Sequence, residues 1–124
     1  MGDRGNIGIR QPHEDAVIYL YTHWSGSYIC PILANGLAKC REAGRLDDPS
    51  YATRIIFDVL TGLEGGSTGF GIAVNCPPDN QHDIPYLIWD EHGVEPHIEY
   101  GCGRFTVDTF VTVYGTKPAE SVAT

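Results

Sequence analysis

The sequence predicts an α+β fold: a mostly antiparallel sheet of about five to six strands, with two helices packed on one face. Two observations lead to this prediction. The order of predicted elements is strand, strand, helix, helix and then about four strands, so strands and helices are grouped rather than alternating. The apolar residues also change their period along the chain, from two to about 3.6 and back to two. We expect one domain over residues 1–114 and a disordered tail over 115–124, which lacks any periodicity.

The first two predicted strands form a β-hairpin. In Asn6–Arg10, the residues Ile7 and Ile9 alternate with smaller or polar residues. A turn that contains Pro12 follows. The next strand, within Ala16–Trp24, is largely apolar on both faces, which is typical of a central strand covered on both sides.

Two helices follow this hairpin. The first is predicted from about Ser27 to Ala43, with Pro31 close to its start, where proline is tolerated. The second has the clearest signals in the chain. Asp48 is a good N-cap, Pro49 stands at the first helical position, and the helix ends near Gly62. The apolar residues of both helices recur at helical spacing: Ile29, Leu33, Leu37 and Cys40 in the first, and Ala52, Ile55, Ile56, Val59 and Leu60 in the second.

The C-terminal half is predicted to contain only strands. They are Phe70–Val74, Tyr86–Asp90, a strand around His97–Tyr100, and Phe105–Tyr114, in which apolar residues alternate. Gly101–Gly103 marks a tight turn or bulge. Several aromatic residues could enrich the sheet face without helices: Tyr19, Tyr21, Tyr86, Trp89 and Tyr100. An exposed aromatic face of this kind would mark an interface, so homo-oligomerisation is plausible.

Composition narrows the choice of partners. The chain has 124 residues, 16 of them acidic and 8 basic, and its net charge of −8 disfavours nucleic acid as a partner. A basic protein partner, or mimicry of nucleic acid, would suit this charge, although such charges commonly serve solubility alone. No apolar run reaches membrane-spanning length and no signal-peptide pattern is present, so we expect a cytoplasmic protein without membrane contact. The four cysteines form no C-x-x-C pair and are expected to be free thiols.

The best candidate for a binding site is the turn between the strand Ala16–Trp24 and the first helix. Backbone N–H groups at a helix start attract phosphate or carboxylate, and His23 and Trp24 stand just before them. The Gly-rich loop Gly65–Gly69 is a second candidate cradle for an anion, although it lacks the lysine and the helix of a P-loop. The predicted ligand-binding residues are His23, Trp24, Ser25, Gly26, Ser27, Gly66, Ser67 and Thr68. Alternatively, Trp24 belongs to the core and Ser27 simply caps the helix.

No catalytic residues, metal ligands or cofactors are predicted. Ser25 and Ser27 lie near His23 but lack the G-x-S-x-G elbow of a hydrolase nucleophile. The leading hypothesis is therefore a non-enzymatic protein that binds a small anionic ligand, such as a nucleotide-type signal. Two alternatives remain: an acidic protein–protein inhibitor or adaptor, and a nucleotide-processing enzyme that uses His23 as its acid or base.

Four segments together resemble a group of small uncharacterised proteins of bacteria and their phages. They are Met1–Ile7, Ile18–Ser27, Asp47–Tyr51 with Arg54–Phe57, and Thr68–Ile72. The similarity covers about residues 1–100. It implies a phage or mobile-element setting, in which the protein would act in the host cytoplasm. It implies no activity and no catalytic residues.

Overall fold

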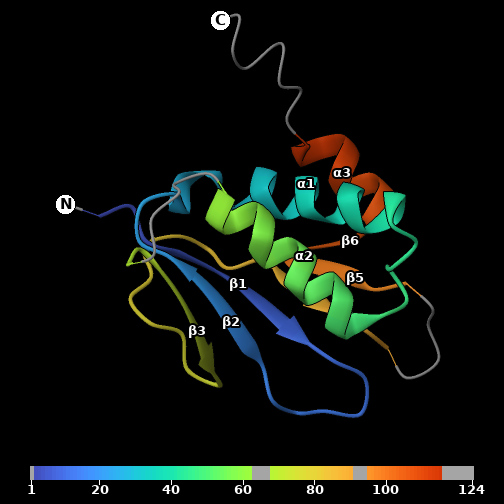
Figure 1. The fold of residues 1–124 in the computed structure, drawn as a ribbon, viewed down its shortest axis with the longest axis horizontal. Helices are drawn as coiled ribbons and strands as arrows, with labels where there is room; N and C mark the ends of the chain where they lie inside the picture. The colour runs from blue at the N-terminus through green and yellow to red at the C-terminus, as the bar shows by residue number, and fades with distance from the viewer. Residues whose placement is uncertain (1, 63–67, 91–94, 116–124) are drawn as a thin grey trace, which may run out of the picture.

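A computed structural model describes residues 2–62, 68–90 and 95–115 (Figure 1). Within them the chain forms six strands, three α-helices and one short 3₁₀ helix. In chain order the elements are β1 (Gly5–Arg10), β2 (Ile18–Thr22), η1 (Gly26–Tyr28), α1 (Ile29–Glu42), α2 (Pro49–Gly62), β3 (Phe70–Val74), β4 (Tyr86–Ile88), β5 (His97–Tyr100), β6 (Gly103–Thr106) and α3 (Val107–Tyr114). The predicted α+β class is confirmed.

The six strands form one mixed sheet in the order β3-β2-β1-β4-β5-β6. All neighbouring strands are antiparallel except β1 and β4, which run parallel. The predicted hairpin of β1 and β2 is confirmed, with Ile7 opposite Leu20 and Ile9 opposite Ile18. The predicted turn at Gly101 joins β5 to β6, and its positive φ of 61° favours glycine at this position.

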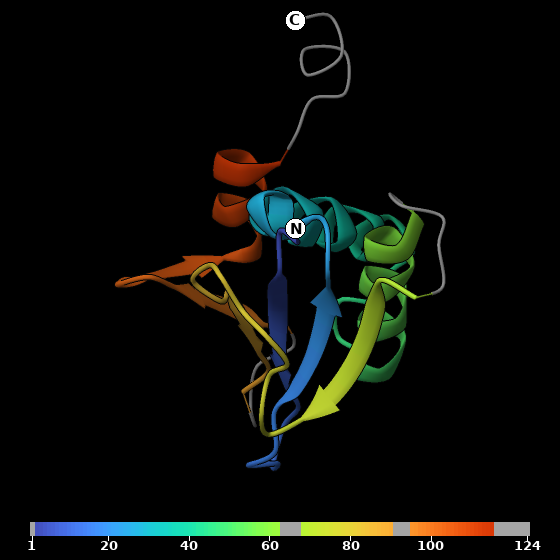
Figure 2. The ribbon, with the colours of Figure 1, turned by 90° about the vertical axis from the view of Figure 1, so that its left-hand side faces the viewer.

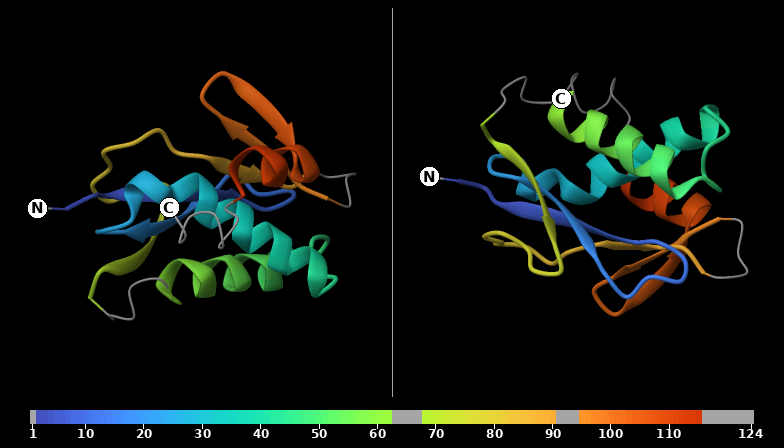
Figure 3. Two further views of the ribbon diagram at one scale, coloured as in Figure 1. Left: turned by 90° about the horizontal axis from the view of Figure 1, so that it is seen from above. Right: turned by 60° about the horizontal axis from the view of Figure 1, so that its bottom comes forward.

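The three helices lie on one face of the sheet, and the core lies between them and the sheet (Figures 2 and 3). Every second residue of the central strands points into this core, and the fully buried apolar residues of the sheet are Ile7, Ile9, Leu20, Leu87 and Ile98. The predicted helices over residues 27–43 and 49–62 are confirmed to within two residues at their ends. The side chain of Asp48 accepts a hydrogen bond of 3.3 Å from the N–H of Tyr51, as its predicted role as N-cap requires.

The third helix is a correction to the sequence prediction, which had Phe105–Tyr114 as one strand. The strand β6 ends at Thr106, and α3 begins at Val107. Thr106 caps the helix, since its hydroxyl accepts a hydrogen bond of 3.2 Å from the N–H of Thr109. Val107 and Phe110, three residues apart on the helix, are both buried in the core. A helix therefore buries apolar residues of this segment, as the predicted strand would have done. Packing against α1 decides between the two.

The predicted aromatic surface is not assembled on one face. Tyr19 and Tyr86 do lie on the side without helices, with their hydroxyl oxygens 3.3 Å apart, but Tyr19 is buried. Trp89 is buried as well, and its indole N–H donates to the carbonyl of Leu46 at 2.8 Å. Tyr100 belongs to the helix side and packs edge-on against Tyr114 on α3. The five aromatic residues therefore do not form one exposed patch, and the expected interface stays a prediction.

The predicted free thiols are confirmed for all four cysteines, of which Cys30 and Cys40 are buried. Among the described residues, no helix is long and apolar enough to cross a lipid bilayer. The predicted tail lies outside the described residues from 116 onward, and that prediction stays open.

Candidate functional site at the N-terminal corner of the sheet

Three segments that are far apart in the sequence meet at one end of β1 and β2. They are Gly2–Asn6, the turn His23–Ser27, and residues 79–82 of the loop between β3 and β4; we call this region the N-terminal corner. Three backbone hydrogen bonds join the segments: Asp3 N–H to the carbonyl of His23 at 2.8 Å, Gly26 N–H to the carbonyl of Asp3 at 2.7 Å, and Gln81 N–H to the carbonyl of Arg4 at 3.0 Å. The predicted binding turn is thus hydrogen-bonded to the N-terminal segment, which in turn is bonded to the loop between β3 and β4.

Asp3 organises this corner. Its carboxylate accepts hydrogen bonds from the hydroxyl of Ser27 and, at 3.0 Å, from the N–H of Ser27. Its other oxygen lies 2.6 Å from Nε2 of His82. The two bonds from Ser27, and then the one from His82, lower the pKa of Asp3 to about 2. The helix-start N–H group that was predicted to attract an external anion already binds a carboxylate of the chain itself.

Two glycines bring the backbones of this corner close together. A Cβ atom on Gly26 would stand 2.7 Å from the carbonyl carbon of Arg4 and 2.7 Å from Cδ2 of His82. A Cβ atom on Gly5 would stand 2.7 Å from Cα of Gly26. Gly26 therefore serves close packing here. Ser25 is buried beside it, and its N–H donates to the hydroxyl of Thr22 at 3.2 Å.

His23 and Trp24 lie on the outer side of the corner, in a row of ring side chains. The Nδ1 atom of His23 is 2.9 Å from the hydroxyl oxygen of Tyr21. The indole ring of Trp24 meets the ring of His23 edge-on at 5.4 Å and that of Phe70 at 6.4 Å. Trp24 is 41% exposed, so it is not the core residue of the alternative prediction. Its ring covers Gly69, where a Cβ atom would fall 1.9 Å from Cζ3 of Trp24.

Arg4 and His23 approach each other across Gly2. A Cβ atom on Gly2 would stand 2.9 Å from Nε of Arg4 and 3.0 Å from Nε2 of His23, so both nitrogens face one small space. The Nε atom of Arg4 is buried and has no hydrogen-bond partner among the described residues. The guanidinium group also pairs with Asp79, at 3.3 Å from Nη1.

The structure brings only part of the predicted ligand-binding set together. His23 through Ser27 form one turn, and the end of the Gly-rich loop joins it, because the N–H of His23 donates to the carbonyl of Gly69 at 2.8 Å. Thr68 is exposed beside Gly69. Gly66 and Ser67 lie outside the described residues, so their predicted role stays a prediction.

Sequence reasoning missed four residues of this corner: Asp3, Arg4, Tyr21 and His82. Asp3 and Arg4 fall within the Met1–Ile7 segment, which the sequence analysis used only for its resemblance. Tyr21 carried a usable signal, because residues two apart on a strand point to the same face, and His23 is its neighbour there. His82 carried no local signal, since its partner Asp3 lies 79 residues away in the chain.

Ser27, Asp3 and His82 do not have the arrangement of a hydrolytic triad. In such a triad the base lies between the nucleophile and the carboxylate. Here the carboxylate of Asp3 lies between the serine hydroxyl and the imidazole. No group of three or more potential metal ligands occurs in the part of the chain that the structure describes.

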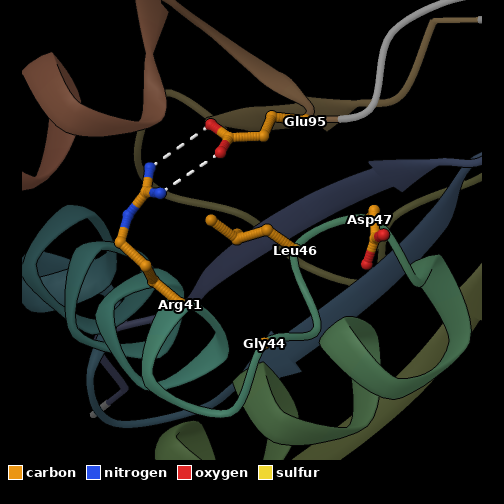
Figure 4. Close-up of a pocket in the computed structure, with 5 residues that line it drawn as sticks. All are labelled: Arg41, Gly44, Leu46, Asp47 and Glu95. Carbon is orange, nitrogen blue, oxygen red and sulfur yellow. Dashed lines mark hydrogen bonds and ion pairs between the residues drawn. The ribbon is translucent and has the colours of Figure 1, made fainter.

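A hollow of about 250 Å³ lies at the opposite end of α1, between the α1–α2 connection and Glu95 (Figure 4). Arg41 is the cation that lines it. Its guanidinium nitrogens lie 3.2 and 3.3 Å from the carboxylate oxygens of Glu95 and 2.7 Å from Asp108. Because two carboxylates already use this cation, the hollow offers little attraction to an anionic ligand.

A second hollow, of about 360 Å³, lies where β1 and β4 end side by side. Arg10 lines it together with three carboxylates, those of Glu14, Asp15 and Asp90. This excess of negative charge disfavours an anion here as well.

No protein-family model matches the chain, nor does any characterised protein or solved structure. The N-terminal corner is therefore the part of the molecule whose chemistry bears on function.

Proposed function

We propose that this chain is a non-enzymatic binding protein for a small ligand that combines a planar ring with an anionic group, such as a nucleotide. The ligand binds on the outer side of the N-terminal corner. One observation carries the proposal: a tryptophan ring, 41% exposed, lies edge-on to a histidine whose Nε2 atom faces the unpartnered Nε of Arg4.

His23 supplies the first contact to the anionic group. When the hydroxyl of Tyr21 donates to Nδ1, the proton of the neutral imidazole is on Nε2. The ring then presents an N–H donor toward Gly2 and Arg4. Arg4 supplies a second N–H donor from its buried Nε, which a ligand reaches when the backbone at Gly2 shifts aside.

Trp24 supplies the contact to the planar ring. Its ring meets those of His23 and Phe70 in T-shaped contacts, and 41% of the side chain is exposed, which leaves ring surface for a base to contact. Stacking of a base on an aromatic side chain contributes about 1–3 kcal/mol and does not depend on which base is present. The contact favours ring-bearing anions over inorganic phosphate.

The anionic group contacts the side chains of Arg4 and His23. It does not contact the backbone of Ser25–Ser27, as the sequence predicted, because Asp3 is already bound there. Binding without turnover is supported by the hydroxyl of Ser27, which donates to the carboxylate of Asp3 and not to an imidazole, as the serine of a hydrolytic triad would. The resemblance to phage proteins suggests a setting: a phage-encoded protein that sequesters a nucleotide signal of its host.

The test is to identify what the protein carries and returns. The purified protein is incubated with a panel of nucleotides and cyclic oligonucleotides, washed and denatured, and the released molecules are identified by mass spectrometry. We expect an intact nucleotide. For Trp24→Ala we expect an affinity weaker by about 5- to 150-fold, the equivalent of one lost stacking contact. For His23→Ala we expect weaker binding, because one N–H donor to the anionic group is lost.

Tyr51→Ala is the matched control, because Tyr51 is an aromatic residue of similar exposure (49%) on α2, away from the corner. It should bind the ligand as the unmodified chain does. Release of a cleaved product would show an enzyme instead. Binding that is unchanged in folded Trp24→Ala and His23→Ala would show that the site is elsewhere. If no molecule of the panel is recovered, the proposal is contradicted and the acidic adaptor hypothesis is favoured.

A further inference from the structure

The strand β3 (Phe70–Val74) lies at the margin of the sheet, with β2 as its neighbour on one side (Figure 1). The loop that follows β3 runs over the sheet face without helices (Figure 2), where Asn6 bonds to the carbonyl of Asp79 at 3.3 Å. Within the described residues no strand pairs with the outer side of β3.

The ladder between β2 and β3 shows which backbone groups point outward. His23 donates to the carbonyl of Gly69, and Asn75 donates to the carbonyl of Val17. Both pairs belong to the same antiparallel register, in which Tyr21 lies opposite Gly71. Hydrogen-bonded pairs alternate in such a ladder, so residues 69, 71, 73 and 75 bond inward to β2. The N–H and C=O groups of residues 70, 72 and 74 therefore point to the open side.

The side chains along this open side are apolar and exposed. Ile72 is 61% exposed and Val74 is 60% exposed. No charged residue occurs among the eleven residues from Thr68 to Pro78, although the whole chain has a net charge of −8. Sheet edges that must remain single are usually protected by a charged residue, a proline or a bulge within the strand, and β3 has none of these.

We propose that β3 pairs antiparallel with β3 of a second copy of this chain, about a two-fold axis at Ile72. In this register Ile72 lies opposite Ile72 of the other copy, and Phe70 lies opposite Val74. All three pairs are hydrogen-bonded pairs, because residues 70, 72 and 74 are the ones whose backbone groups are free. The two sheets then join into one continuous sheet.

Two features select a second copy as the occupant. The first is symmetry: a two-fold axis at Ile72 matches every outward donor with an acceptor and every exposed apolar side chain with another. The second is charge. Two copies with a net charge of −8 each repel one another, and the stretch from Thr68 to Pro78 lets them meet without placing like charges opposite each other. This inference does not depend on the proposed ligand site.

The experiment measures the mass of the full chain in solution by analytical ultracentrifugation, over a concentration range up to about 100 μM, which covers dissociation constants in the micromolar range. We expect a monomer–dimer equilibrium. In Ile72→Lys, two ammonium groups would lie opposite each other at the axis, so the dimer should be lost over this range. In Ile72→Pro only an outward N–H group is removed, and the dimer should weaken at least tenfold while the inward ladder to β2 remains.

Val113→Lys is the matched control. Val113 is an exposed apolar residue (57%) on α3, and its replacement changes the net charge by the same amount. Both lysine variants reduce the net negative charge. If only the general repulsion between the copies mattered, both variants would associate more strongly than the unmodified chain. Loss of the dimer in Ile72→Lys and its retention in Val113→Lys supports the proposal. A monomer at every concentration overturns it, as does a dimer that both Ile72 variants retain. Thermal unfolding of each variant confirms that it is folded.

Discussion

Two networks of charged side chains connect distant parts of this chain, and they differ in what they bind. Asp3 binds a backbone N–H, a hydroxyl and an imidazole at the N-terminal corner, and its side chain is 32% exposed. Arg41 binds the carboxylates of Glu95 and Asp108 near the other end of α1, and all three side chains are more exposed than Asp3: 44% for Arg41, 45% for Glu95 and 82% for Asp108.

The two networks differ in how well water can replace the protein partners. Water can solvate the exposed partners of Arg41 almost as well as the ion pairs do, so such pairs contribute little free energy. Asp3 satisfies an N–H at a helix start whose surroundings are packed by Gly5 and Gly26, and water has less access there. We expect the first network to stabilise the fold measurably and the second one only slightly.

The largest expected effect is that of Gly26→Ala. A Cβ atom at this position would stand 2.7 Å from the backbone carbon of Arg4, so the N-terminal segment must shift and Asp3 with it. We expect the free energy of unfolding to fall by about 2–3 kcal/mol, at the upper end of the cost of overpacking. Gly62→Ala is the control, since no described atom beyond its own helix backbone and chain neighbours lies within 4 Å of the added Cβ. It should change the free energy of unfolding by less than about 1 kcal/mol. Equal effects of the two variants in urea unfolding would contradict close packing at the corner.

Asp3→Ala should have the next largest effect. The variant removes the acceptor for the N–H and the hydroxyl of Ser27, and we expect a loss of about 1–2 kcal/mol, as for other lost N-terminal caps. Hydrogen exchange should also increase at the first turns of η1 and α1. Ser27→Ala keeps the hydrogen bond from the backbone N–H, so it should lower the free energy of unfolding by less than Asp3→Ala does. An equal loss in the two variants would mean that the hydroxyl is the only important donor.

The pH dependence of stability should separate the networks as well. The pKa of Asp3 is about 2 in the folded chain and 3.8 for an ordinary aspartate, so the unfolded chain binds a proton more readily. The contribution of Asp3 is therefore complete above about pH 4 and is lost as the pH falls from there towards 2. Asp3→Asn should flatten this part of the pH profile of the thermal midpoint. An unchanged slope would show that Asp3 titrates normally.

Arg41→Ala should have the smallest effect. It breaks the contacts to Glu95 and Asp108, which are exposed, and we expect a loss below about 1 kcal/mol that decreases further in high salt. Arg54→Ala, which breaks the exposed pair with Asp58 within α2, provides the reference for a single pair of this kind. A loss from Arg41→Ala as large as that from Asp3→Ala would overturn the comparison.

The sequence by itself determined the elements whose signals are local. The cap at Asp48, the proline at the first position and the glycine at the end defined α2, and alternation defined β1 and β2. These signals are reliable because the interacting residues are a few positions apart. Sequence reasoning also singled out His23 and Trp24, from their place between a strand and a helix, and the structure keeps them together.

Only the tertiary structure decided the C-terminal helix and the chemistry of the candidate site. The residues of α3 fit either period, and burial of Val107 and Phe110 beside α1 selected the helix. Asp3 took the place foreseen for an external anion because folding brought it to Ser27, 24 residues away, and to His82, 79 residues away. Contacts over such separations leave no pattern within a short window of one sequence, because each residue's partner is set by the packing of the whole chain.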